Sequence, residues 1–266
     1  MEAHNGVRVF LKINVFFIFS SQQIKRYQFI TVLVFFSWSV INRVMNKQSW
    51  ALTSIKYIVV VISISLTVLV AISMLNSPFL GQFIIFGIFL FVVGYCCADL
   101  LTGTIHWFCD TFFSENTPLI GKTIIESFRE HHTRPHWITK DRFIEQDSTS
   151  FFVLLPLLLN FLLKNANNIE LLSYLLSGSV LVGLCFGAFG TNLFHKWAHS
   201  QEPPVFAIKL QTMGLILTPK AHKKHHNNHS KSFCVTSGWL NPMLDYINFF
   251  HYLENFLRFF FHAKKI

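Results

Sequence analysis

The sequence predicts an all-α integral membrane protein, with about four membrane-embedded helices in two hairpins and a histidine-rich cap on one side. Three observations predict this fold class. Hydrophobic residues make up 52% of the 266 residues, and 31 residues are phenylalanine. Mean hydropathy is +0.44, which with that composition is typical of a membrane protein. Long uncharged apolar runs also alternate with polar segments that hold most of the 13 histidines.

The first predicted hairpin joins two long apolar runs. Residues 57–75 carry no charged side chain, and at about 1.5 Å per helical residue they can cross a bilayer core. Residues 76–78 form a short turn, and residues 79–98 are a second uncharged run of spanning length. We expect Asp99 to cap the end of this second span rather than to bind metal.

The second predicted hairpin is less regular. Residues 151–163 are apolar but short for a span, and Pro156 interrupts them. A brief loop at 165–170 leads to residues 171–190, which are long enough to cross. The third apolar segment can therefore either cross the membrane or dip into it.

Two complete hairpins would place residues 42–56, 99–148 and 191–266 on one side of the membrane. Most lysines and arginines lie in these segments, so the positive-inside rule predicts that this side is cytoplasmic. The net charge of +9 is then expected to face anionic lipid headgroups. Nucleic-acid binding is excluded, because such proteins do not carry several long apolar runs.

We expect two regions, a variable N-terminal extension at 1–50 and a membrane-embedded domain at 51–262. The first 41 residues hold two short apolar runs, which suit either a targeting segment or a dispensable extension. Residues 246–261 mix aromatic and charged residues at helical spacing, which predicts a helix in the membrane interface. The five cysteines form no Cys-x-x-Cys pair, so free thiols are expected.

Histidines occur in groups whose spacing brings the side chains to one helical face or to adjacent positions. With one nearby carboxylate, they exceed the three or four protein ligands of a single zinc site, so two metals fit better. Imidazole with some carboxylate suits iron, zinc, copper or nickel, and iron is favoured because a redox metal can also activate dioxygen. The candidate ligands are His106 with Asp110, His131 with His132, His195 with His199, and His222 with His225 and His226.

Simpler interpretations accompany this one. Asp110 can bind metal directly or orient His106 through its other ring nitrogen, and the role of His229 is equally open. The stretch 222–229 could be a basic solvated loop if it stood alone, and Lys223 and Lys224 are expected to meet headgroups or an electron donor. The tryptophans at 107, 197 and 239 are expected to mark an interface or to line a lipid tunnel. The remaining histidines are expected to be hydrogen-bonded surface groups, namely His4, His136, His251 and His262.

With these residues in view, the chain resembles the plasmanylethanolamine desaturase family, which includes a bacterial light-response member and, more distantly, the plant chloroplast fatty-acid desaturase 4 type. The resemblance covers about residues 55–258. It rests on ADLLTGTIHWFCDTF (98–112), FREHHTRPHWITKDRFIEQD (128–147), TNLFHKWAHS (191–200) and LTPKAHKKHHNNHSKSFCVTSGWLN (217–241). The resemblance implies that Asp110 is the family's acidic residue. It also implies that the metal ligands are His106, His131, His132, His195, His199, His222, His225 and His226.

The implied activity is oxygen-dependent desaturation at two iron ions. The implied substrate is a 1-O-alkyl (plasmanyl) ethanolamine phospholipid, which becomes a vinyl-ether plasmalogen. Because no flavin or nicotinamide fingerprint is present, electrons must come from a partner. The resemblance implies cytochrome b5, or a ferredoxin-like donor in a bacterium. It also implies an endoplasmic reticulum membrane in a eukaryote, or the inner membrane in a bacterium, with the di-metal cap in the cytoplasm.

Other functions are compatible with parts of this pattern. An acyl-lipid desaturase of the plant type would use a similar histidine set, and Met213, Gly214 and Leu215 resemble that branch. A metal transporter would need polar groups inside the spans, which the apolar runs almost lack. A zinc protease would need His-Glu-x-x-His, which is absent.

Overall fold

The structure is a computed structural model that describes residues 50–118, 120–140, 143–165, 167–168 and 170–261. Every regular element in these ranges is helical. The predicted N-terminal extension lies outside the described residues, apart from Trp50. In chain order the elements are α2 (Trp50–Leu75), α3 (Leu80–Phe112), the π-helix η1 (Gly121–Ile125), α4 (Glu126–Thr133), the 3-10 helix η2 (Trp137–Thr139), α5 (Phe143–Asn165), α6 (Leu172–His199), α7 (Val205–Thr212), α8 (Pro219–Asn227), α9 (Asn241–Tyr246) and α10 (Phe249–Phe261).

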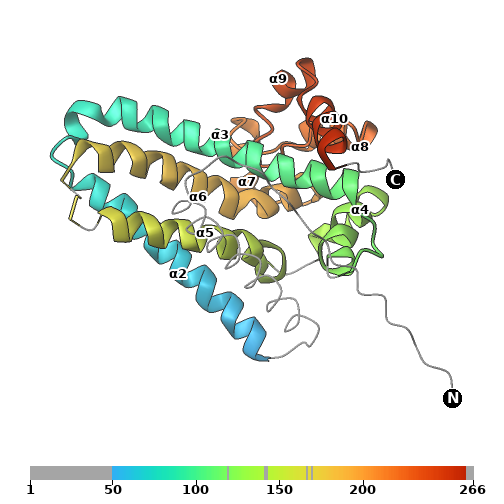
Figure 1. Cartoon of the computed structure of the whole chain (residues 1–266), viewed down its shortest axis with the longest axis horizontal. Coiled ribbons are helices and arrows are strands. Elements are labelled where there is room, and N and C mark those ends of the chain that lie inside the picture. The colour runs from blue at the N-terminus through green and yellow to red at the C-terminus, as the bar shows by residue number, and fades with distance from the viewer. Residues whose placement is uncertain (1–49, 119, 141–142, 166, 169, 262–266) are drawn as a thin grey trace. The chain divides into compact units, whose positions relative to one another are not determined.

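Four long helices form the body of the described domain. By length and composition, 4 helices could cross a membrane: α2, α3, α5 from Asp147 onward, and α6. The turns of the α2–α3 and α5–α6 hairpins lie at one end, while α4, α8, α9 and α10 gather at the other (Figure 1). The predicted all-α multi-pass architecture with two hairpins is confirmed, and the histidine-bearing segments share one end.

Two predicted boundaries were wrong. Helix α3 does not end at residue 98 but continues to Phe112, so Asp99 is not a helix cap. Its carboxylate accepts hydrogen bonds from backbone N–H groups of a later loop, so a carboxylate in the middle of the helix has hydrogen-bond partners although it is buried. Helix α5 begins at Phe143 and contains Pro156, so the third apolar segment is long enough to cross. Burial of Leu154 and Leu158 on either side of Pro156 offsets the missing hydrogen bond.

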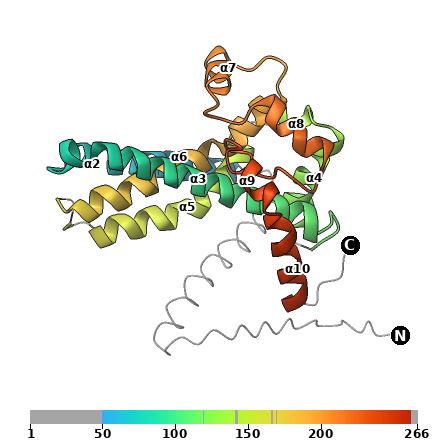
Figure 2. The same ribbon diagram turned by 90° about the horizontal axis from the view of Figure 1, so that it is seen from above.

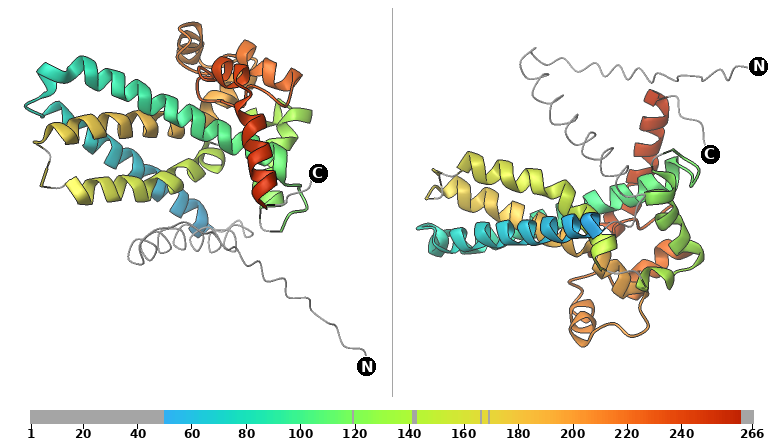
Figure 3. Two further views of the ribbon diagram at one scale, coloured as in Figure 1. Left: turned by 45° about the horizontal axis from the view of Figure 1, so that its top comes forward. Right: turned by 90° about the horizontal axis from the view of Figure 1, so that it is seen from below.

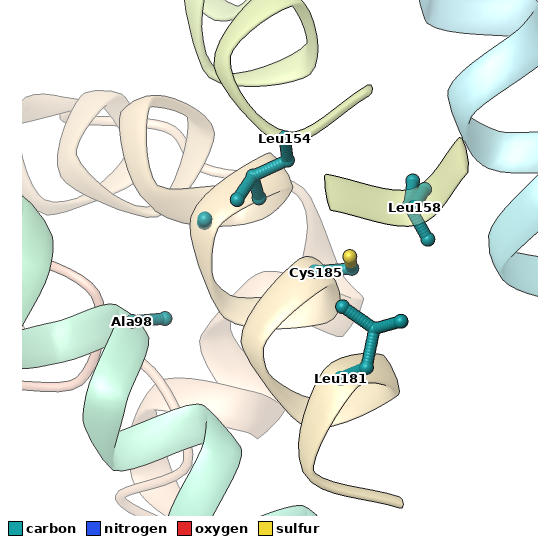
Figure 4. Packing of buried hydrophobic residues seen from close by; sticks show 6 residues of the cluster. Ala98, Leu154, Leu158, Leu181 and Cys185 are labelled. Carbon is teal, nitrogen blue, oxygen red and sulfur yellow. The ribbon is translucent and has the colours of Figure 1, made fainter. Parts of the chain in front are cut away.

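Helices α3 and α6 approach each other closely through glycine. A Cβ built on Gly94 of α3 would overlap the Val180 carbonyl of α6, and one built on Gly183 of α6 would overlap the Phe91 carbonyl of α3. Small residues allow such contact between apolar helices. Beside this contact, α5 packs Leu154 and Leu158 onto Leu181 and Cys185 of α6, with Ala98 of α3 nearby in the same cluster (Figure 4).

The C-terminal segment packs one side on α3 and leaves the other side open. The helix predicted from residue 246 begins at Phe249, because Asn248 adopts a positive φ of 51° that separates it from α9. Phe250 is buried against Trp107 and Phe233. Tyr252, Phe256 and Phe259 are exposed. The helix is thus amphipathic, and its place in the membrane interface stays a prediction.

Candidate metal centre

All nine predicted site residues come together at the end of the bundle that carries α4 and α8. Four separate elements supply them, and the structure arranges the histidines in two adjacent groups. One group contains His106, His131, His132 and His225, and the other contains His131, His195, His199 and His222. Within each group the potential ligand atoms lie within 4.8 Å of one another. Figure 3 shows α4 and α8 beside the end of α3 in both views.

The first group surrounds Asp110. Its Oδ2 lies 3.3 Å from His106 Nε2, 3.6 Å from His132 Nε2 and 3.5 Å from His225 Nε2. The Nε2 atoms of His132 and His225 are 3.1 Å apart. Among the described residues, His106 Nε2 and both Asp110 oxygens are buried without a hydrogen-bond partner. Three imidazoles and a carboxylate therefore converge on one point, as the ligands of a metal do.

The second group is tighter. His222 Nε2 lies 2.8 Å from both His195 Nε2 and His199 Nε2, and the last two are 3.2 Å apart. A ring nitrogen offers one proton or one lone pair, so it cannot satisfy two such neighbours by hydrogen bonding. Nitrogens bound about 2.0–2.1 Å from a common ion would lie roughly 2.9–3.4 Å apart. The spacing therefore fits a metal site better than a hydrogen-bond network.

His226 and His131 extend this arrangement. His226 Nε2 lies 2.9 Å from His222 Nε2 and 3.3 Å from His199 Nε2, which places it with the second group. The His131 ring centre is 4.3 Å from that of His132 and 4.9 Å from that of His195, so His131 stands between the groups. Its buried Nε2 has no hydrogen-bond partner among the described residues. The donor set thus fits two neighbouring ions.

Backbone carbonyls orient two of these rings. Phe233 O lies 3.2 Å from His106 Nδ1, and Lys231 O lies 2.8 Å from His225 Nδ1. A carbonyl can only accept, so each Nδ1 carries the proton and each Nε2 keeps its lone pair toward the centre of the group. These two contacts could not be predicted from the sequence, because the partner of a backbone carbonyl is set by tertiary packing.

Asp99 holds that loop against α3. Its buried carboxylate accepts hydrogen bonds from the backbone N–H groups of Thr236 at 3.0 Å, Ser237 at 3.0 Å and Gly238 at 3.2 Å. The Asn241 side chain pairs with both the N–H and the carbonyl of Cys234, at 2.9 Å each. Asp99 therefore positions the loop rather than binding metal.

Four of the candidate histidines outside the spans are held in the neutral form. Burial, with the charge of neighbouring imidazoles, lowers the pKa of His132 to about 3 and that of His226 to about 4. The same causes hold the pKa of His131 and of His222 well below the ordinary value. Neutral imidazole is the form that binds metal, so no proton has to be displaced from these rings at neutral pH.

The other predicted residues lie in different surroundings. His229 is exposed, with its ring centre 4.3 Å from that of His132, so its role stays open. His136 and His251 are exposed, as expected. Trp107 and Trp197 are buried in protein packing, while Trp239 is partly exposed and donates to Gly214 O at 2.6 Å. His4 and His262 lie outside the described residues.

Four candidate spans and a buried double group of histidines define a multi-pass membrane protein with a candidate site for two metals. Comparison with known proteins then gives the family. The chain belongs to the lipid desaturase domain family, whose model matches residues 95–265. It is therefore a member of a family of lipid-desaturating oxidoreductases.

Relatives with curated names fall into two kinds. The chain is 31% identical over 208 residues to a plasmanylethanolamine desaturase of Myxococcus xanthus, covering 78% of this chain and 72% of the relative. It is 39% identical over 172 residues to plasmanylethanolamine desaturase 1 of Mus musculus, covering 63% of each. It is 34% identical over 173 residues to chloroplastic fatty acid desaturase 4 of Arabidopsis thaliana, covering 60% of this chain and 48% of the relative. No solved structure matches the chain.

Proposed function

We propose that this protein is an oxygen-dependent di-iron desaturase that converts a 1-O-alkyl ethanolamine phospholipid into the vinyl-ether plasmalogen. The observation that carries the proposal is the double histidine group at the end of four candidate spans, in a chain of the lipid desaturase family. Two relatives named as plasmanylethanolamine desaturases support the choice of substrate.

The reaction balances with one dioxygen and an external donor. Two C–H bonds break at the first two carbons of the O-alkyl chain, and a carbon–carbon double bond forms between them. Dioxygen takes four electrons and becomes two water molecules. Two of these electrons come from the substrate and two from the donor, with two further protons. Iron bound to the two groups would supply the redox chemistry that unactivated C–H bonds require.

In this proposal the residues of the chain bind the two metals, orient the ligand side chains and shield the site from water. His106 and His225 are fixed by backbone carbonyls, and Asp110 offers a carboxylate to both. Phe128 and Phe233 pack on the His106 ring, with centre distances of 5.4 Å and 6.0 Å. This apolar cover keeps bulk water from one side of the site, which favours oxidation of the lipid over side reactions.

The electron donor in this proposal is an acidic carrier such as cytochrome b5, or a ferredoxin-like protein in a bacterium. Helix α8 buries His222 and His225 and exposes Lys220, Lys223 and Lys224. A basic surface so close to the candidate ligands suits an acidic partner, which charge would steer to it. The positive-inside rule supports a cytoplasmic location for this end, and the proposed membrane is the endoplasmic reticulum of a eukaryote or the inner membrane of a bacterium.

Lipid mass spectrometry tests the proposal. The chain would be expressed in cells that lack plasmalogen synthesis, beside the His222→Ala variant, and the acid lability of any new lipid would be measured. A vinyl ether formed by the wild type alone is the expected result. A new double bond in an acyl chain would support the second candidate, an acyl-lipid desaturase, which the similarity to the chloroplast protein favours. Neither product, in cells with a compatible donor and a metal-loaded protein, would refute both.

A further inference from the structure

The loop between α8 and α9 carries both backbone carbonyls that orient ligands of the first histidine group. Lys231 O lies 2.8 Å from His225 Nδ1, and Phe233 O lies 3.2 Å from His106 Nδ1. Ser232 stands between these two loop residues in the chain. Figure 2 shows α8 and α9 at the same end of the bundle as α4, so the loop that joins them also lies at the end that holds the candidate metal centre.

Ser232 adopts a backbone conformation that is uncommon for a residue with a side chain. Its φ is 58°, in the left-handed region, where the Cβ crowds the backbone. Ser232 is also buried, with 5% of its surface exposed. Rotation about its N–Cα bond changes the direction of the Lys231 carbonyl relative to that of Phe233, so the left-handed conformation helps to set where both carbonyls point. Such a conformation persists only where the surrounding structure holds it.

The Asp245 carboxylate binds Ser232 through both of its oxygens. Asp245 Oδ1 accepts a hydrogen bond from the Ser232 N–H at 3.0 Å, and Oδ2 accepts one from the Ser232 hydroxyl at 2.8 Å. Hydrogen bonds to a carboxylate are stronger than those between neutral groups. Asp245 belongs to α9, and its neighbour Leu244 is buried in one cluster with Trp107 of α3 and with Phe233. A residue of a packed helix therefore fixes the middle of the loop.

The loop also packs on the rings that its carbonyls orient. The ring centre of Phe233 lies 5.1 Å from that of His225 and 6.0 Å from that of His106. It also lies 5.0 Å from the ring centre of Phe250 in α10. Both histidines belong to the first histidine group and neither belongs to the second. A change in this loop should therefore act on the first group.

We propose that Asp245 is a positioning residue for the first metal site, and that it acts by holding Ser232 in the left-handed conformation. The two carbonyls then meet the Nδ1 atoms of His106 and His225, and both Nε2 lone pairs face Asp110. This role rests on the two-metal part of the proposed function, and it adds the means by which the chain orients two ligands. Removal of such a partner typically lowers metal affinity by about 10–100-fold.

Titration of the metal-free full chain with Co²⁺ in detergent measures metal binding without turnover. The visible absorption of bound Co²⁺ reports its ligands, and elemental analysis gives the ions bound per chain. We expect the wild type to bind two ions, and Asp245→Ala to bind one as the wild type does and the other about tenfold more weakly or worse. Asp245→Asn keeps an acceptor oxygen and should stay close to the wild type. The control Glu170→Ala removes an exposed carboxylate between α5 and α6 and should match the wild type.

Two variants of Ser232 separate the backbone conformation from the loss of the hydroxyl group. Ser232→Gly and Ser232→Val both lack the hydroxyl, but glycine adopts a positive φ readily and a β-branched residue does not. We expect Ser232→Gly to keep the two-ion titration of the wild type, and Ser232→Val to weaken the same ion as Asp245→Ala, with the same change in absorption. Equal affinities in the two variants would overturn the role given to the left-handed conformation. This pair decides the question even if Asp245→Ala does not fold.

Other outcomes would also overturn the positioning role. One is an Asp245→Ala variant that binds both ions with wild-type affinity. Another is an equal weakening of both ions, because that is the effect of a general loss of stability. A wild type that binds fewer than two ions would overturn the two-metal part of the proposed function, and this role with it. The two failures are distinguishable, because the last one appears in the wild type and the others only in the variants.

Discussion

Replacing Asp99 with alanine is expected to loosen the loop that orients His106 without removing any predicted metal ligand. The carboxylate accepts three backbone N–H groups at 3.0–3.2 Å, and all three lose their acceptor in the variant. An unsatisfied buried donor costs about 1–3 kcal/mol, so the loss is about 3 kcal/mol or more. For a domain of this size, that corresponds to a fall in Tm of roughly 6–12 °C.

Two measurements on purified protein check this expectation. Thermal unfolding in detergent gives the change in Tm, and elemental analysis gives metal bound per chain, which should fall because Phe233 O no longer holds His106. Asp99→Asn keeps one acceptor oxygen and is expected to lose less, while Glu170→Gln controls for removal of a negative charge. If Asp99→Ala kept the wild-type Tm and metal content, the role assigned to this carboxylate would be wrong.

Four further predictions follow from the site and the packing. Turnover should be abolished, with the protein still inserted, in each of His195→Ala, His222→Ala and His226→Ala. The control His251→Ala, at an exposed position, should change turnover little. Wild-type product levels in any of the first three variants would refute the assignment of that histidine as a ligand. Gly183→Ala should lower stability by about 1–3 kcal/mol in unfolding experiments, because a methyl group would meet the Phe91 carbonyl; unchanged stability would contradict the close helix contact. The metal-free protein should lose stability as the pH falls below about 6.5. In the folded protein the pKa of His132 is about 3 and that of His226 about 4, both below the unfolded value, so the unfolded chain binds more protons. Denaturation should give a smaller free energy of unfolding at about pH 5 than at neutral pH, and a larger one would count against the prediction. Deletion of residues 1–41 should leave product formation largely intact, and an inserted but inactive truncation would show that the extension is needed.

Hydropathy was sufficient to predict the bundle, because an apolar run of spanning length has few other structures available to it. Hydropathy gave a wrong boundary where a buried polar residue is hydrogen-bonded by a segment far away in the sequence. Asp99 looked like the end of a span, yet its partners are Thr236 and Ser237, more than a hundred positions later in the chain. Pro156 looked like an interruption, yet the helix continues through it because packing against α6 offsets the lost hydrogen bond.

The candidate site, too, could be predicted only in part from the sequence. Helical spacing identified the residues, but it did not predict how they divide between two groups. On α8, a step of three residues turns the side chain back by about 60° and a step of four turns it forward by about 40°. His225 therefore faces Asp110 while His226 faces His199. The loop carbonyls that orient His106 and His225 are brought there by tertiary packing, for which the sequence has no periodic signal.

The single carboxylate among so many imidazoles has a consequence for electron transfer. Imidazole ligands are neutral, and Asp110 contributes one negative charge, so two divalent ions held here would keep most of their positive charge in a buried setting. Such an excess favours the reduced ions over the oxidised ones. An oxidised iron centre held by these residues would therefore accept an electron readily from a mild carrier, and Asp110→His would make that reduction easier still.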